Sequence, residues 1–114
     1  MDEILISLKA LSEEIRVRIV MLLFEREACV CELMEVFGMA QSKLSHHLLM
    51  LKDAGILRDK RRGKWNYYSI NKKKMNQANK ELLSSLPLWL KEEGLILRDR
   101  LRFNGELKCK TPRK

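Results

Sequence analysis

The chain has 114 residues, which is room for one small domain with a modest core. It carries 23 Lys and Arg against 15 Asp and Glu, and the formal net charge of +8 favours a polyanionic partner. The charge is uneven, because residues 1–35 hold four basic and eight acidic side chains while residues 36–114 hold nineteen and seven. This asymmetry predicts a directed electrostatic face, although a basic tail on an unrelated domain would produce the same totals.

Other features exclude whole classes of protein. No apolar run approaches the roughly 18 residues of a membrane-spanning helix, and Met1–Ile4 lacks the basic region of a secretory signal. Three cysteines are an odd number, which fits poorly with a disulfide framework. We therefore expect a cytoplasmic protein without a membrane partner. The chain has no Ser/His/Asp set, phosphate loop or cluster of carboxylates, so we do not expect an enzyme.

Helical periodicity dominates the first half of the chain. Leucines predict a short helix over residues 5–11, and Ser12 is a favourable N-cap for a second helix that extends to about Arg26. Cys31–Phe37 is predicted as a third helix, which ends at Gly38, a residue typical of helix C-termini.

A fourth helix is expected over residues 41–54, before Gly55. Leu44, Leu48 and Leu51 recur at helical spacing and form its buried stripe. The side chains predicted to face outward are Ser42, Ser45, His46 and Lys52.

The period changes after the fourth helix. Ile56–Arg58 and Trp65–Ile70 alternate like strands, and the segment 59–64 between them contains the glycine expected of a hairpin loop. Together with the helices, this predicts a mainly α fold with a small β hairpin, in the α+β class.

The remaining chain returns to a helical period. A stripe over residues 75–83 is expected to be interrupted by Pro87 and to resume over residues 88–101. From Phe103 onward the sequence is polar and basic. We therefore expect one domain over residues 1–101 and a basic C-terminal tail over residues 102–114.

The order of helix, turn, polar-faced helix and basic hairpin predicts a winged helix-turn-helix that binds double-stranded DNA. In that fold the second helix of the pair directs polar side chains to base edges in the major groove. The candidates on the fourth helix are Gln41, Ser42, Lys43, Ser45 and His46. The hairpin cations can neutralise phosphates or enter the minor groove, and the candidates are Arg61, Arg62 and Lys64. A solvated helix face would explain the polar run alone, and the adjacent basic hairpin favours DNA.

Two further groups have structural interpretations. Trp65, Tyr67 and Tyr68 resemble a stacking platform for single-stranded nucleic acid, but aromatics on such a strand usually pack onto the helices, and we expect packing. His46 and His47 are adjacent, so they point to different faces of a helix and are not expected to share a metal ion.

Cys29 and Cys31 form a Cys-x-Cys pair at the predicted start of the third helix. Residues two apart on a regular helix lie about 200° apart, so the pair can chelate one ion only where the helix begins. The helix dipole favours thiolates there, whereas Glu27, Glu32 and Glu35 oppose them. From the residues alone, two ordinary buried cysteines explain the pair equally well.

These motifs together resemble the ArsR/SmtB repressors. The resemblance covers about residues 4–70 and is carried by Leu11–Arg16, Glu27–Leu33, Gln41–Leu48 and Gly63–Tyr68. It implies a homodimeric winged-helix repressor that leaves operator DNA when a metal or metalloid binds. The Cys-Val-Cys sequence is most similar to the branch that responds to arsenite and antimonite, in which Cys29 and Cys31 would be thiolate ligands.

Two departures from the family pattern bear on the ligands. The arsenic branch often has a third cysteine three positions after the second, where this chain has Met34, a neutral and weaker sulfur ligand. Cys109 would supply the third thiolate, or two thiolates would suffice. Zinc- and cobalt-sensing relatives use ligands on the C-terminal helix, and the absence of histidine after His47 disfavours that branch.

The sequence thus predicts a repressor that needs no cofactor for folding, pairs through its N- and C-terminal helices, and is induced by arsenite or antimonite. A cadmium or lead sensor and a thiol-redox switch are alternatives on the same fold. A winged helix that binds only protein is the alternative from another class.

Overall fold

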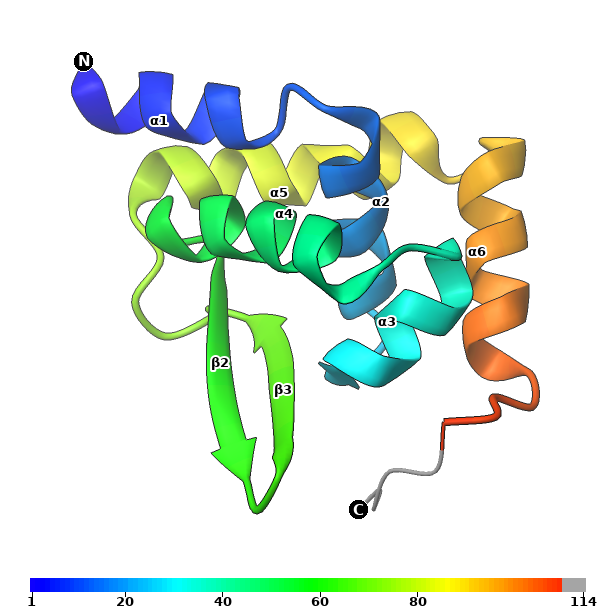
Figure 1. The fold of residues 1–114 in the computed structure, drawn as a ribbon. Helices are drawn as coiled ribbons and strands as arrows, with labels where there is room; N and C mark the ends of the chain where they lie inside the picture. The colour runs from blue at the N-terminus through cyan, green and yellow to red at the C-terminus, as the bar shows by residue number, and fades with distance from the viewer. Residues whose placement is uncertain (110–114) are drawn as a thin grey trace.

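Six helices and a small antiparallel sheet make up residues 1–109, the part of the chain that the computed structural model describes (Figure 1). The mainly α, α+β class is therefore confirmed. The elements in chain order are α1 (Asp2–Ala10), α2 (Glu14–Leu23), β1 (Ala28–Cys29), α3 (Val30–Phe37), α4 (Gln41–Asp53), β2 (Leu57–Arg62), β3 (Trp65–Ile70), α5 (Gln77–Leu90) and α6 (Gly94–Asn104). Within residues 1–109, every helix is too short or too polar to cross a membrane.

The sheet has the order β1–β3–β2, so the expected hairpin has a third strand beside it. β1 pairs Cys29 with Tyr67, and the two hairpin strands pair from Leu57 opposite Ile70 to Arg62 opposite Trp65. The expectation that residues 59–64 form the loop is wrong, because β2 continues through Arg62. The turn is only two residues long, and Gly63 supplies the positive φ of 62° that such a turn requires.

α4 packs against α2 and α3, and it runs roughly parallel to α1 and α5 (Figure 1). Its predicted leucine stripe is confirmed, because Leu44, Leu48 and Leu51 are each fully buried. Ile19 of α2 and Leu33 of α3 belong to the same buried cluster. Burying side chains of this size contributes about 1.5–3 kcal/mol each, so the orientation of α4 is set by its apolar face.

The N-terminal end of α2 differs from the prediction. Glu13 is the N-cap residue, whereas the Ser12 hydroxyl donates a hydrogen bond to the Lys9 carbonyl at the end of α1. Ser12 therefore caps the preceding helix. The helix also ends at Leu23, before Arg26, because the chain must then extend to pair with β3.

The C-terminal helices also differ from their expected limits. Pro87 lies inside α5, and the interruption comes between Leu90 and Gly94 instead. α6 continues to Asn104, and the expectation that Phe103 begins a polar tail is wrong, because its side chain is fully buried. The division at residue 101 remains a prediction, and the last five residues of the expected tail, 110–114, lie outside the described residues.

A buried polar contact joins α2 to α4. The Nε of Arg16 donates a hydrogen bond of 3.1 Å to the Nδ1 of His47, and Arg16 also pairs with Glu13. Both side chains are buried, whereas the neighbouring His46 is exposed, so the two histidines do point to different faces. Burial, and then the Arg16 cation, lower the pKa of His47 below its ordinary value of 6.5.

This lowered pKa predicts a dependence of stability on pH. His47 is neutral in the folded protein, and its contribution is complete above pH 6.5 and is lost as the pH falls through the lowered folded pKa. The free energy of unfolding should therefore fall on acidification, by at most about 1.4 kcal/mol per pH unit from this group. Urea denaturation at a series of pH values measures it. His47→Gln should flatten the profile and the exposed His46→Gln should not; equal profiles for wild type and His47→Gln would contradict the assignment.

Candidate nucleic-acid interface and cysteine site

The turn between α3 and α4 has the geometry of a helix-turn-helix. Gly38 ends α3 in the left-handed conformation, with φ 59° and ψ 41°, and α4 begins three residues later at Gln41. This conformation favours glycine, so the predicted stop at Gly38 is confirmed. The buried leucines turn one face of α4 inward, and the side chains left exposed near its N-terminus are Gln41, Ser42, Lys43, Ser45 and His46.

The hairpin cations fall into two groups. Arg61 and Lys64 are exposed, and the Lys64 Nζ lies 5.0 Å from the centre of the Trp65 ring. The Arg62 guanidinium instead pairs with the Glu27 carboxylate and lies 4.6 Å from the centre of the Tyr67 ring. The sequence gives no reason to separate the three cations. In the structure Arg62 differs from the other two, because it already pairs with Glu27 in the loop before β1.

Two of the three aromatic residues of β3 are buried. Tyr67 and Tyr68 are buried, with 3% and 9% of their surface exposed, so the predicted packing is confirmed for both. Trp65, nearer the hairpin turn, is partly exposed.

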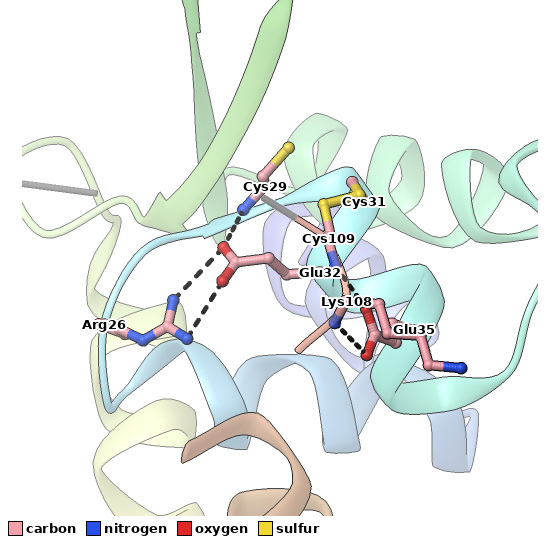
Figure 2. Close-up of a disulfide and its surroundings, with 7 residues drawn as sticks. All are labelled: Arg26, Cys29, Cys31, Glu32, Glu35, Lys108 and Cys109. Carbon is pink, nitrogen blue, oxygen red and sulfur yellow. Dashed lines mark hydrogen bonds and ion pairs between the residues drawn. A yellow bond between two sulfur atoms is a disulfide. The ribbon is translucent and has the colours of Figure 1, made fainter. Parts of the chain in front are cut away.

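Cys29 lies where β1 becomes α3. It is buried, has an extended backbone with φ −76° and ψ 149°, and is the N-cap residue of the helix. Its N–H donates a 3.1 Å hydrogen bond to the Glu32 carboxylate, which closes a capping box (Figure 2). A capping box usually has Ser or Thr at the N-cap and Glu three residues later. Cys29 and Glu32 have this spacing, so the sequence contained the pattern with cysteine at the N-cap position.

Glu32 is itself almost fully buried and is paired with Arg26 at 3.2 Å. The Arg26 guanidinium lies 3.8 Å from the centre of the Phe103 ring and donates a hydrogen bond to the Phe103 carbonyl. From its sequence position Glu32 was expected only to oppose thiolates by its charge, and this connection to α6 was not predicted. It joins residues 77 positions apart, which no local pattern indicates.

Cys31 and Cys109 are joined by a disulfide, with 6.0 Å between their Cα atoms (Figure 2). The odd number of cysteines was expected to fit poorly with a disulfide framework, whereas two of the three are joined in the structure. The pairing arises because the chain after α6 turns back to the start of α3 (Figure 1). Of the three predicted metal ligands, the structure brings Cys31 and Cys109 together, and Cys29 is free. Within residues 1–109, no three His, Cys, Asp or Glu side chains are already gathered to hold a metal ion.

A cavity of about 280 Å³ lies between Cys29, Cys31 and the candidate DNA-binding residues. One wall comes from the start of α3, a second from the first turn of α4, and a third from the hairpin. The lining residues that belong to these predicted sites are Cys29, Cys31, Met34, Gln41, Ser45, Arg61 and Lys64. The cavity is therefore lined by residues of both predicted sites.

An exposed helix after a short turn, with a basic hairpin beside it, defines a winged helix-turn-helix DNA-binding regulator. The sequence profile described as "Bacterial regulatory protein, arsR family" matches residues 13–59. The chain is 40% identical over 97 residues to the arsenic resistance transcriptional regulator ArsR1 of Pseudomonas putida, covering 75% of this chain and 76% of that protein. The chain belongs to this family: it is a DNA-binding transcriptional repressor and not an enzyme.

Two further comparisons agree with this assignment. The arsenic resistance transcriptional regulator ArsR2 of Pseudomonas putida is 37% identical over 95 residues, which cover 80% of this chain and 83% of that protein. The solved structure of HlyU from Vibrio cholerae superposes with a TM-score of 0.69 at 24% identity, covering 80% of this chain and 95% of HlyU. This structural likeness supports the fold alone.

Proposed function

We propose that the protein leaves operator DNA when trivalent arsenic or antimony binds its cysteine thiolates. The observation that carries the proposal is the shared cavity, which Cys29 and Cys31 line together with Gln41, Ser45 and Arg61. The relatives named as arsenic resistance regulators support arsenite as the inducer.

The donor atoms suit such a ligand. Trivalent arsenic and antimony prefer soft thiolates, and the fold brings Cys109 to Cys31 at the start of α3, where Cys29 is the N-cap residue. Cys29 precedes the helix in an extended conformation, so its sulfur is not held to the divergence that a regular helix would impose on the Cys29–Cys31 pair. Ligation by Cys31 and Cys109 requires that their disulfide first be reduced, because the thiolate is the ligand form. Met34 also lines the cavity, as a weaker sulfur neighbour.

Ligand binding would oppose DNA binding through α3. Drawing the Cys29 and Cys31 sulfurs to one atom would strain the first turn of α3, whose cap is held by Glu32. α3 packs against α4, so a shift in this turn would reorient Gln41 and Ser45. The two ligands then bind competing states of one protein, and each must weaken the other by the same factor.

The DNA contacts are proposed from exposure and charge. Gln41, Ser42, Lys43, Ser45 and His46 would face the major groove, and Arg61 and Lys64 would contact the backbone or the minor groove. Arg62 would act mainly by supporting the hairpin through Glu27, although the sequence placed it among the DNA-contacting cations.

A homodimer is proposed from an uncovered apolar face on α1 and α5, which pack against each other (Figure 1). Leu5 and Leu8 are each 47% exposed, Leu88 is 73% exposed and Trp89 is 70% exposed. Two-fold pairing through this face would cover it and set two α4 helices about 34–36 Å apart, one turn of DNA.

A thiol-redox sensor is the second candidate, and the Cys31–Cys109 disulfide favours it. Oxidation would remove two of the three proposed sulfur ligands and tie the C-terminal segment to α3. The two functions are separable, because release of DNA by arsenite under reducing conditions requires no oxidant.

The division of the hairpin cations predicts different effects of two equal charge changes. Arg61→Ala should weaken binding to a random-sequence duplex and reduce the slope of log K against log salt by about one, because a phosphate contact is lost. Arg62→Ala is the matched control and should change the slope much less, since Glu27 already pairs with that cation. Fluorescence anisotropy over a salt series measures both. Equal losses of slope would show that Arg62 contacts DNA as Arg61 does.

Induction predicts a separation of DNA binding from arsenite response. In fully reduced protein, Cys29→Ser and Cys31→Ser should keep the DNA affinity within about twofold and raise the arsenite concentration for half-release by at least about tenfold, within the usual range of allosteric coupling. Cys109→Ser tests whether Cys109 is the third ligand. A similar rise in the arsenite concentration for half-release would assign Cys109 as a ligand, and no change would indicate a site with two thiolates. Normal release from DNA by the Cys29/Cys31 double serine variant would refute the sensor assignment.

The apolar face predicts the effect of a single charge on association. Trp89→Glu should weaken dimerisation by at least about tenfold, because a large aromatic side chain of the proposed interface is replaced by a charge. Leu101→Glu is the control, because Leu101 of α6 is similarly exposed but lies outside the proposed interface. It should leave dimerisation unchanged. Sedimentation equilibrium at micromolar concentration measures both. A wild-type monomer that still binds DNA tightly would exclude the proposed dimer.

A further inference from the structure

Glu35 lies one helical turn after Cys31, on the same face of α3. Its carboxylate receives two backbone hydrogen bonds from the end of the chain: the Lys108 N–H donates to Oε2 at 2.7 Å and the Cys109 N–H donates to Oε1 at 2.9 Å (Figure 2). Both oxygens are thus used by consecutive residues, and the second of them carries the sulfur that meets Cys31.

The segment that leads to this contact is anchored along its length. We name residues 105–109 the C-terminal strap. Before it, Phe103 is fully buried, and the Arg102 guanidinium donates a 3.1 Å hydrogen bond to the Glu35 carbonyl. Within it, Leu107 is partly buried and packs against the core. Glu35 therefore holds the strap from its side chain and contacts α6 through its backbone.

We infer that Glu35 is a positioning residue that clasps the strap so that the Cys109 sulfur is held beside Cys31 as the third sulfur of the ligand site. This inference rests on the proposed thiolate site, but the clasp itself concerns only the two sulfurs and does not depend on arsenic.

Physical reasons favour a carboxylate at this position. An ionised carboxylate accepts two N–H donors at once, and such charge-assisted bonds are stronger than neutral ones. The same two bonds, from Lys108 and then Cys109, lower the pKa of Glu35, so the side chain remains ionised at neutral pH. The clasp also raises the effective concentration of Cys109 near Cys31, two residues that are 78 positions apart in the sequence. Glutamine has one acceptor oxygen, and its amide group would face an N–H donor.

The first experiment measures the clasp without any metalloid. Reduced protein is equilibrated in glutathione buffers, in which the two thiols and one glutathione disulfide give the Cys31–Cys109 disulfide and two glutathione thiols. The disulfide fraction is read by alkylation and mass spectrometry. Glu35→Gln should shift this equilibrium toward the dithiol by about tenfold. Glu106→Gln removes the same charge from an exposed position in the strap and should match wild type. An unchanged equilibrium in Glu35→Gln would overturn the inference.

The second experiment tests the ligand role on the same reduced proteins. Arsenite affinity, followed by the ultraviolet absorption of arsenic–thiolate bonds, should fall in Glu35→Gln toward that of Cys109→Ser. Adding Glu35→Gln to Cys109→Ser should cause no further loss, because the clasp would act only through that sulfur. A further loss, or full affinity in Glu35→Gln, would overturn the positioning role. Equal urea denaturation of reduced wild type and Glu35→Gln excludes a general loss of structure. If wild type does not bind arsenite, the proposed function fails, while the glutathione equilibrium still decides whether Glu35 clasps the strap.

Discussion

The cysteine region depends on the contacts that the buried Glu32 carboxylate makes with Arg26 and with Cys29. A buried charge is costly unless it is paired and hydrogen-bonded, and here the partners are the Arg26 guanidinium and the Cys29 N–H. Hydrogen bonds to charged groups contribute about 1.5–3 kcal/mol each, so the conformation of Cys29 and the start of α3 are strongly coupled to this carboxylate. Arg26 in turn packs on Phe103, which extends the same requirement to α6.

These contacts explain how a helix as short as α3 is held in place beside the candidate sensor residues. α3 is only eight residues long, and isolated helices of that length are not stable in water. Its N-terminus is held by the Glu32 capping box, its C-terminus by the Gly38 turn, and its apolar face by Leu33 in the core. A ligand bound at its first turn, as proposed above, would therefore act on a short element that is held at both ends.

Local patterns in the sequence were enough for much of the fold. The leucines of α4 and the turn at Gly38 follow from periodicity and glycine conformation, and both were predicted. The burial of Tyr67 and Tyr68 was also predicted, because aromatic residues of a strand usually pack onto the neighbouring elements. β1 was missed because two residues are too short for a recognisable alternation, and they become a strand only by pairing with β3. Ser12 was placed on the wrong helix because a serine between two helices can cap either, and the choice depends on how α1 packs.

Less of the candidate site than of the fold could be predicted from the sequence, because the site depends on contacts between distant segments. The residue types at Cys29, Cys31, Gln41 and Lys64 suggested a thiolate site and a DNA interface. Which side chains pair was decided by contacts between distant segments: Arg62 with Glu27 and Cys31 with Cys109. Neither pairing has a signature in spacing.

The two-residue strand β1 places a strict limit on how this region can vary. Ala28 lies opposite Tyr68 and Cys29 opposite Tyr67, and successive residues of a strand point to opposite faces. An insertion or deletion of one residue in the chain between Leu23 and Ala28 would shift Arg26 and Glu27 relative to their partners Glu32 and Arg62. The same change within the strand would exchange the faces of Ala28 and Cys29, turning the thiol to the other side of the sheet. The alignment of Cys29 with the hairpin is thus quantised: only a shift of two residues would keep the thiol on its present side of the sheet.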